Sequence, residues 1–263
     1  MFKRSISAVL ALCPVAAAHD TWVETNTNVI RSGDAVHVQL KLGNHGNDHR
    51  DFKLAGKVDP AECTLEVISP DGSRYDLRDR LKDVGYTPTE GYWTAKFAGV
   101  RPGVYLVASM SDKVVQYAPK RSVKSAKTCF VVAESLDRVP EENPGFERVL
   151  GHPFELVPIV NPVTPMGPGQ PIEVRLLYKD EPLASAKVSF IPQGANLKAG
   201  FDPDYERTTD SDGRASFSPK TGTIYLIVAH HEEPSESGEG FDSTKYSATL
   251  TVFVPELCPC CRN

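Results

Sequence analysis

The chain has 263 residues, a formal net charge of −5 and six cysteines. This length suits one large domain or two ordinary ones. The negative balance argues against nucleic acid or an anionic membrane as the partner, because both carry negative charge themselves.

Residues 1–18 have the features of a secretory signal peptide. Lys3 and Arg4 supply the positive start, an apolar segment covers residues 6–15, and Ala16-Ala17-Ala18 forms a cleavage site. Cutting after Ala18 leaves a mature chain that begins at His19. No later apolar run approaches the roughly 20 residues needed to span a bilayer. We therefore expect a periplasmic or secreted protein with no transmembrane segment in the mature chain.

Residues 19–135 predict a first antiparallel β-sandwich domain. Apolar and polar side chains alternate over residues 35–42, as in a half-buried strand. Cys63 and Cys129 each lie in a strand-like segment, and an exported chain permits disulfides, so we expect these two to be bridged. Turn residues separate the further strand candidates of this half, which cover residues 63–68, 92–97, 104–108 and 128–133.

Residues 136–152 predict a linker, because they are polar, contain Pro140 and Pro144 and lack β alternation. Residues 153–255 predict a second β-sandwich domain, so the fold class is all-β with two immunoglobulin-like or prealbumin-like sandwiches. Residues 210–213 resemble the start of a calcium loop but lack its glutamate, and a hairpin turn explains them better. The strand candidates of this half cover residues 154–160, 172–178, 186–192, 215–218, 224–230 and 246–254.

Histidine supplies the candidate metal ligands. After processing, His19 carries an α-amine and an imidazole that are both neutral donors near pH 7, a pair that suits copper(II) or nickel(II). His45 and His49 lie in a polar loop after a strand, and His230 and His231 end another strand. Successive strand residues face opposite sides, so only one of the last two joins a given site. The predicted metal site comprises His19, His45 and either His230 or His231, although loop histidines are more often simply solvated.

Residues 256–263 form a cysteine-rich tail with Cys258, Cys260 and Cys261. Thiolates suit copper(I) or zinc, and a disulfide within the tail or to another molecule is the alternative. Removal of the signal leaves an odd number of cysteines, so at least one thiol stays free or pairs between molecules. The sequence carries no nucleophile elbow, nucleotide-binding loop or zinc-protease motif, and it therefore gives no support to those enzyme classes.

Short motifs spread over nearly the whole mature chain carry a family resemblance. They include His19-Asp20-x-Trp22-x-Glu24, Gly43-x-His45, Arg121-Ser122-x-Lys124-x-x-Lys127, Phe154-Glu155-Leu156-Val157-Pro158, Thr209-Asp210-x-Asp212-Gly213-Arg214 and Tyr246-x-Ala248-x-Leu250. With them the chain resembles bacterial periplasmic proteins labelled nickel- or cobalt-transport component-like, the nickel uptake transporter family, whose core is a domain of unknown function. The resemblance implies two β-sandwiches, the second like a carboxypeptidase-regulatory or prealbumin module, and a periplasmic metal-related role. Asn44, which blurs the loop match, and the cysteine tail depart from the family, and the tail favours copper.

The predicted function is binding of a divalent transition metal, copper or nickel/cobalt, for uptake, delivery or storage. A membrane metal transporter is the expected partner, and we expect no enzymatic activity. The alternative is a β-sandwich adhesion or carbohydrate-binding module in which the histidines are incidental, since exported sandwiches commonly serve that way. A copper oxidase built on a histidine brace is a third, less favoured hypothesis.

Overall fold

The structure is a computed structural model that describes residues 19–45, 59–87, 90–115 and 117–256. Strands make up 54% of the chain and helix 3%. Two 3-10 turns, η1 (Pro60–Glu62) and η2 (Arg78–Arg80), supply this helix. Every described segment between the strands is a turn or irregular. The predicted all-β fold of packed sheets is therefore confirmed, although the largest sheet also contains two parallel strand pairs.

A four-stranded antiparallel sheet forms the outer layer of the first half, in the order β1-β3-β7-β6. The alternation of residues 35–42 places Val36, Val38 and Leu40 in the core, as expected. β1, which the sequence patterns did not predict, has four consecutive buried residues and no alternation. The strands are β1 (Asp20–Thr25), β3 (Ala35–Gly43), β7 (Gly91–Ala98) and β6 (Lys82–Gly85).

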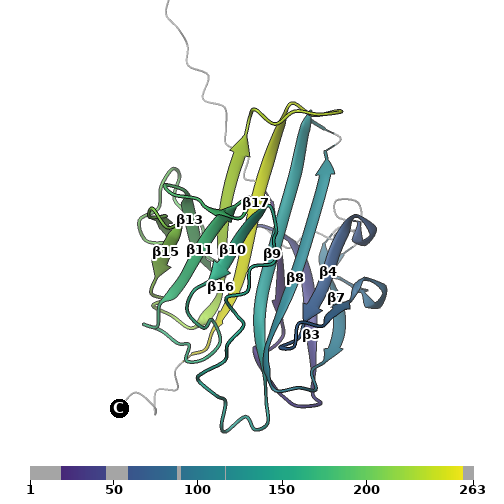
Figure 1. The fold of residues 1–263 in the computed structure, drawn as a ribbon, viewed down its shortest axis with the longest axis vertical. Helices are drawn as coiled ribbons and strands as arrows, with labels where there is room; N and C mark the ends of the chain where they lie inside the picture. The colour runs from purple at the N-terminus through teal and green to yellow at the C-terminus, as the bar shows by residue number, and fades with distance from the viewer. Residues whose placement is uncertain (1–18, 46–58, 88–89, 116, 257–263) are drawn as a thin grey trace, which may run out of the picture.

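A nine-stranded sheet runs through both halves of the chain, in the order β14-β13-β16-β17-β9-β8-β4-β5, with β2 also paired to β9 (Figure 1). β17 and β9 are parallel, and they join the two halves at the centre of the sheet. The strands are β14 (Glu206–Thr208), β13 (Lys187–Pro192), β16 (Thr223–Glu233), β17 (Ser243–Val254), β9 (Lys120–Ala133), β8 (Gly103–Val114), β4 (Cys63–Ile68), β5 (Arg74–Asp76) and β2 (Val29–Arg31).

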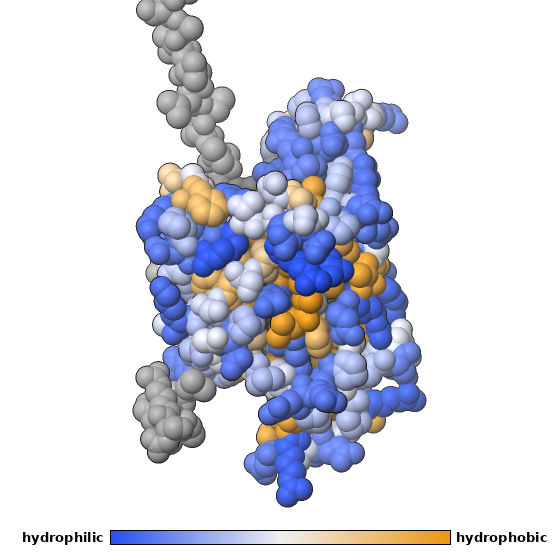
Figure 2. Space-filling model, turned by 60° about the vertical axis from the view of Figure 1, so that its left-hand side comes forward, coloured by the Kyte–Doolittle hydropathy of each residue, from blue (hydrophilic) through white to orange (hydrophobic). Residues whose placement is uncertain are grey.

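A smaller sheet covers the second half of the long sheet. It contains β10 (Phe154–Pro158), β11 (Ile172–Tyr178), β12 (Glu181–Pro182) and β15 (Arg214–Phe217), with β11 paired to the other three. Phe190 of the long sheet stacks on Phe217 of this sheet, with ring centroids 5.2 Å apart. The outer surface on this side is mostly hydrophilic, and its apolar side chains gather near the middle (Figure 2).

The two outer sheets lie on opposite faces of the long sheet. Phe130 of β9 faces the first sheet and Leu250 of β17 faces the small sheet, each within its own apolar core. Phe146 and Leu150, from the predicted linker 136–152, pack with Val131 on the remaining face of β9. The linker therefore packs on the sheet, and the predicted division of the chain at these residues stays a prediction.

The expected disulfide between Cys63 and Cys129 is wrong, because both thiols are free and buried. β8 lies between their strands, with Cys63 opposite Ser111 and Cys129 opposite Leu106. Two strand spacings and five residues of offset separate the cysteines by roughly 19 Å, against the 7 Å that a disulfide tolerates. They also face opposite sides of the sheet, since each belongs to a different apolar cluster.

The turn at residues 210–213 is present, but it is not a hairpin. The side chain of Asp210 accepts hydrogen bonds from the backbone N–H groups of Asp212 (2.9 Å) and Arg214 (2.8 Å). These bonds explain why an aspartate occupies this position of the turn. The flanking strands β14 and β15 belong to different sheets, so the turn carries the chain from one layer to the other. Within the described residues, no helix is long and apolar enough to cross a membrane.

Candidate functional site at the start of β1

β1 lies across the seam where β17 and β9 pair in parallel. The side chains of β17 alternate, with Tyr246, Ala248 and Leu250 in the second core and hydroxyl residues on the other face. Thr249 Oγ1 donates a hydrogen bond to the backbone oxygen of Thr21 at 2.9 Å. A polar face that would suit solvent is therefore covered by β1.

Three polar side chains form a row beneath the first residues of β1. In the sheet register His230 pairs with Ser247, and Ser247 pairs with Lys124, so the three lie side by side on β16, β17 and β9. Each makes a hydrogen bond to residue 19 or 20. This row places the predicted start of the mature chain at a fixed position on the long sheet.

Asp20 is the centre of this arrangement. Its Oδ1 accepts hydrogen bonds from His230 Nε2 at 2.7 Å and from Ser247 Oγ at 3.0 Å. Burial raises the pKa of Asp20, but the bond from His230 and the nearby charge of Lys124 outweigh it, so the pKa lies below its usual value. In the neutral form of the imidazole, this contact places the proton on Nε2 and the lone pair on Nδ1.

Lys124 holds the other side of the row. Its Nζ donates a hydrogen bond to the backbone oxygen of His19 at 2.8 Å. Burial lowers the pKa of Lys124, and the charge of Asp20 opposes that shift. The side chain of His230 is 41% exposed, so the row is open to solvent at its histidine end.

His45 lies elsewhere on the same face. Its Nε2 is 3.2 Å from the backbone oxygen of Ile224, and its ring meets the edge of Trp22 at 5.8 Å. Burial lowers the pKa of His45, which favours the neutral ring. Ile224 precedes His230 by six residues on β16, a separation of roughly 20 Å along the strand. The structure therefore does not bring His45 to His230.

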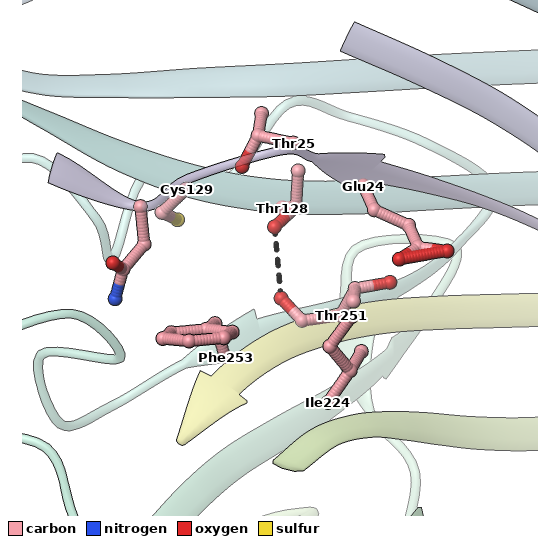
Figure 3. A pocket seen from close by; sticks show the side chains of 8 residues that line it. Glu24, Thr25, Thr128, Cys129, Ile224, Thr251 and Phe253 are labelled. Atoms are coloured by element: carbon pink, nitrogen blue, oxygen red, sulfur yellow. Dashed lines mark hydrogen bonds between the residues drawn. The ribbon is translucent and has the colours of Figure 1, made fainter. Parts of the chain in front are cut away.

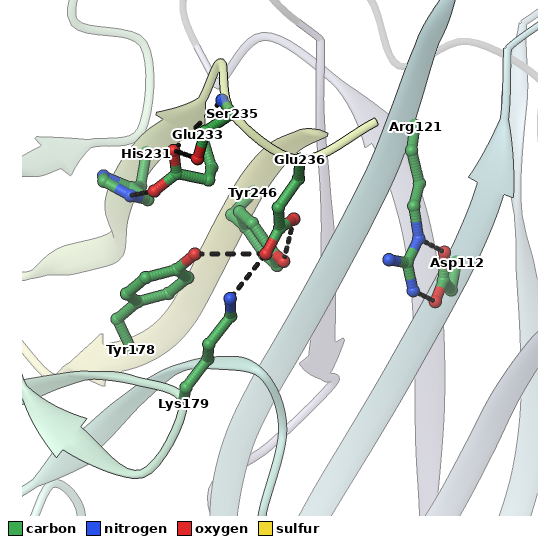
Figure 4. Close-up of polar contacts among 9 residues, drawn as sticks. All are labelled: Asp112, Arg121, Tyr178, Lys179, His231, Glu233, Ser235, Glu236 and Tyr246. Carbon is green, nitrogen blue, oxygen red and sulfur yellow. Dashed lines mark hydrogen bonds and ion pairs between the residues drawn. The ribbon is translucent and has the colours of Figure 1, made fainter. Parts of the chain in front are cut away.

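His231 points to the opposite face of the long sheet from His230. Its ring packs against Tyr178, with centroids 4.6 Å apart, and its Nε2 lies 4.0 Å from Glu233 Oε2 (Figure 4). This position follows from the alternation of β16, as the sequence predicted for the pair. Only His230 of the two faces the start of β1.

Glu236 closes the hairpin between β16 and β17 beside His231 (Figure 4). It accepts hydrogen bonds from Lys179 Nζ at 2.5 Å and from Tyr246 OH at 2.7 Å. Burial raises the pKa of Glu236, but these bonds outweigh it and bring the pKa to about 2. Since the carboxylate is already bound by these donors, we interpret this cluster as a structural tie for the hairpin.

A small pocket lies further along β1, between the strand and the long sheet (Figure 3). Glu24, Thr128, Cys129 and Thr251 are among the residues that line it. Its volume is about 10 Å³, which is room for about one water molecule. The hydroxyl of Thr251 is buried there without a protein partner. The pocket is too small for an organic ligand.

The sequence identified His19 and His230 but not the residues that hold them. Lys124 was missed because residues 120–127 are too polar to predict a buried strand. Ser247 falls in the predicted strand 246–254 and Asp20 follows the predicted cleavage site, but no local pattern indicates that either lies close to His230. Two signals for these residues were present in the sequence. Asp20 directly follows His19, and Ser247 lies on the polar face of a strand whose other face is apolar. His49, Cys258, Cys260 and Cys261 lie outside the described residues. Within the described part, no three His, Cys, Asp or Glu side chains are grouped to hold a metal ion.

The sequence profile of the family described as "Domain of unknown function (DUF4198)" matches residues 16–233. The chain belongs to this family. The description names no activity, so the nickel or cobalt transport role of the resemblance remains a proposal. No curated protein matches the chain.

Solved structures resemble the chain only distantly. A DUF4785 family protein from Legionella pneumophila is 11% identical with a TM-score of 0.28, over 79% of this chain and 52% of that protein. Salmonella alpha-2-macroglobulin is 12% identical with a TM-score of 0.26, over 90% of this chain and 15% of its own. The Yersinia pseudotuberculosis adhesin InvE is 17% identical with a TM-score of 0.21, over 88% and 58%. The chain thus spans about half or less of the first two, and TM-scores this low support no functional conclusion.

Proposed function

We propose that the protein is an exported metal-binding protein that holds copper(II) or nickel(II) at its processed amino terminus. The ligands are the α-amine and imidazole of His19 together with the imidazole of His230. In this role the protein captures the ion in the periplasm and stores it or delivers it to a membrane transporter. Nitrogen donors of this type suit these two ions.

The hydrogen bond between His230 and Asp20 is the observation that carries this proposal. Metal-binding histidines commonly donate their second ring N–H to a carboxylate, which fixes the tautomer and orients the ring. Here Nε2 lies 2.7 Å from Asp20 Oδ1, and Asp20 directly follows His19 in the chain. The pair therefore already has the partner that a histidine ligand needs, next to the residue that carries the amine.

The proposed donor set needs only two side chains, because its remaining ligand is the α-amine of His19. The two nitrogens of His19 would form a chelate, and an imidazole nitrogen of His230 would supply the third donor. His45 and His231 are left out of this set, because one lies near Ile224 and the other packs against Tyr178 on the opposite face.

The test is a competition titration of the mature protein, beginning at His19, with copper(II) and nickel(II). We expect one tight site per chain. Adding one residue before His19 removes the α-amine and is expected to weaken binding at least tenfold, and His230→Ala is expected to do the same. His45→Ala and His37→Ala, on an exposed β3 position, are matched controls that should retain affinity.

Native affinity in both the extended protein and His230→Ala would contradict the proposal. The adhesion or carbohydrate-binding alternative would then be the better hypothesis. Loss of affinity in His45→Ala alone would instead restore His45 as a ligand and require a rearrangement of the loop that follows β3.

A further inference from the structure

We infer that Lys124 is the positioning residue of the amino-terminal site: its ammonium group holds the His19 carbonyl so that the mature terminus lies beside His230. The inference rests on the proposed function for its metal-binding consequence, while the positioning itself has a metal-free test. Lys124 would not be a metal ligand.

The register of the sheet fixes this role. Lys124, Ser247 and His230 occupy one row on three adjacent strands, and β1 crosses above them. Lys124 Nζ donates to the His19 oxygen at 2.8 Å, while Ser247 Oγ and His230 Nε2 donate to Asp20. His19 and the first residue of β1, Asp20, are thus held on both sides of the peptide bond that joins them.

This anchoring matters because the residues that it holds lie at the very start of β1. β1 begins at Asp20 and pairs with β3 as far as Asp20 opposite Gly43. Strand ends fray unless side chains tie them down. A chelate formed by the amine and ring of His19 needs the His19 backbone at a constant distance from His230, and the bond from Lys124 supplies that constraint.

The placement of Lys124 supports a positional role over a solvated one. The residue is half-buried, and its ammonium group donates to the His19 carbonyl, so a neutral side chain in its place removes that hydrogen bond. Its positive charge also opposes a metal cation nearby, so the sign of the effect separates two roles. Positioning predicts weaker metal binding when Lys124 is removed, and charge repulsion alone predicts tighter binding.

The experiment compares Lys124→Met, which keeps the length but removes the donor, with Lys124→Arg, which keeps a donor and the charge. Lys113→Met, a lysine on neighbouring β8 that pairs with Glu62, is the matched control. All are made as mature proteins beginning at His19. Without metal, we measure the rate at which an aminopeptidase removes His19. With copper(II), we measure affinity by competition and the electron paramagnetic resonance spectrum.

We expect Lys124→Met to lose His19 at least tenfold faster, to bind copper at least tenfold more weakly and to give an altered copper spectrum. Lys124→Arg should restore all three toward native values, and Lys113→Met should change none. Trimming at the native rate in Lys124→Met, or copper binding as tight as native with the same spectrum, would overturn the inference. If the native protein binds no metal while Lys124→Met is still trimmed faster, the proposed function fails and the positioning of the terminus stands.

Discussion

Lys124 and Lys127 lie three residues apart on β9, yet they face opposite sides of the long sheet. Lys127 is 2% exposed and forms an ion pair with Glu155, itself 1% exposed. Glu155 also accepts hydrogen bonds from the backbone N–H groups of Leu150 (2.8 Å) and His152 (3.0 Å). Lys124 instead holds a chain end next to a solvent-exposed histidine. The Lys127–Glu155 side is closed to solvent, whereas the β1 side is open at His230.

The difference indicates where this protein uses buried charge for structure and where for function. The Glu155 carboxylate, bound by Lys127 and two backbone N–H groups, ties residues 150 and 152 to the long sheet. The row of Lys124, Ser247 and His230 ends in a solvent-exposed imidazole, which can still bind a ligand. Four predictions test this comparison.

The largest effect is expected for Lys127→Met. This change leaves the Glu155 carboxylate buried without its cation, which costs about 3–5 kcal/mol of unfolding free energy. Urea denaturation measures it. Adding Glu155→Gln to Lys127→Met should recover much of the loss, because the unpaired charge is then gone. A loss no greater than that of Lys124→Met would break the comparison.

A second prediction concerns His152, which lies beside Glu155 on the linker side. Burial lowers its pKa from 6.5 to about 4. Above pH 6.5 the ring is neutral in both the folded and unfolded states, so its protonation does not lower the unfolding free energy there. As the pH falls from 6.5 to 4, the unfolded state binds a proton and roughly 3 kcal/mol of stability is lost. Denaturation across this range should show the decline, and His152→Gln should show a smaller one.

A third prediction concerns the remaining lysines of β9. Lys124→Met should cost about 1–3 kcal/mol of unfolding free energy, since one charged hydrogen bond to a carbonyl is removed. Lys120 pairs with Glu232 and is 45% exposed, so Lys120→Met should lower the unfolding free energy by less than about 1 kcal/mol. The expected order along the strand is therefore Lys127, then Lys124, then Lys120, and urea denaturation of the three variants would reveal any other order.

The smallest effect is expected at the two buried cysteines. Burial raises the pKa of the Cys63 thiol to about 11 and that of Cys129 to about 12, so both resist thiol reagents in the folded protein. Non-reducing peptide mapping should find both alkylated only after unfolding. Recovery of a peptide that links Cys63 to Cys129 would contradict the register of β4, β8 and β9.

The sequence was sufficient for the fold class and for most core strands. Alternation and turn residues located β4 and β11 to the residue, because one face of each meets a core and the other does not. They failed at β1, which is buried on both sides, and at the first half of β9, where Lys124 and Lys127 occupy opposite buried faces. Pairing between strands far apart in the chain leaves no local pattern, so neither the β9–β17 seam nor the row at Lys124 was predictable.

The parallel pairing of β9 with β17 also affects how the chain folds during synthesis and whether its two halves can be separated. During synthesis β9 is complete long before its partner exists, since Ser243 to Thr251 of β17 pair with Lys120 to Thr128. Until then that edge of β9 is an open strand that can pair with another molecule. Contacts this distant in sequence also slow folding. A chain cut within residues 136–152 would expose two complementary edges, so the separated halves are expected to aggregate alone and to associate when mixed.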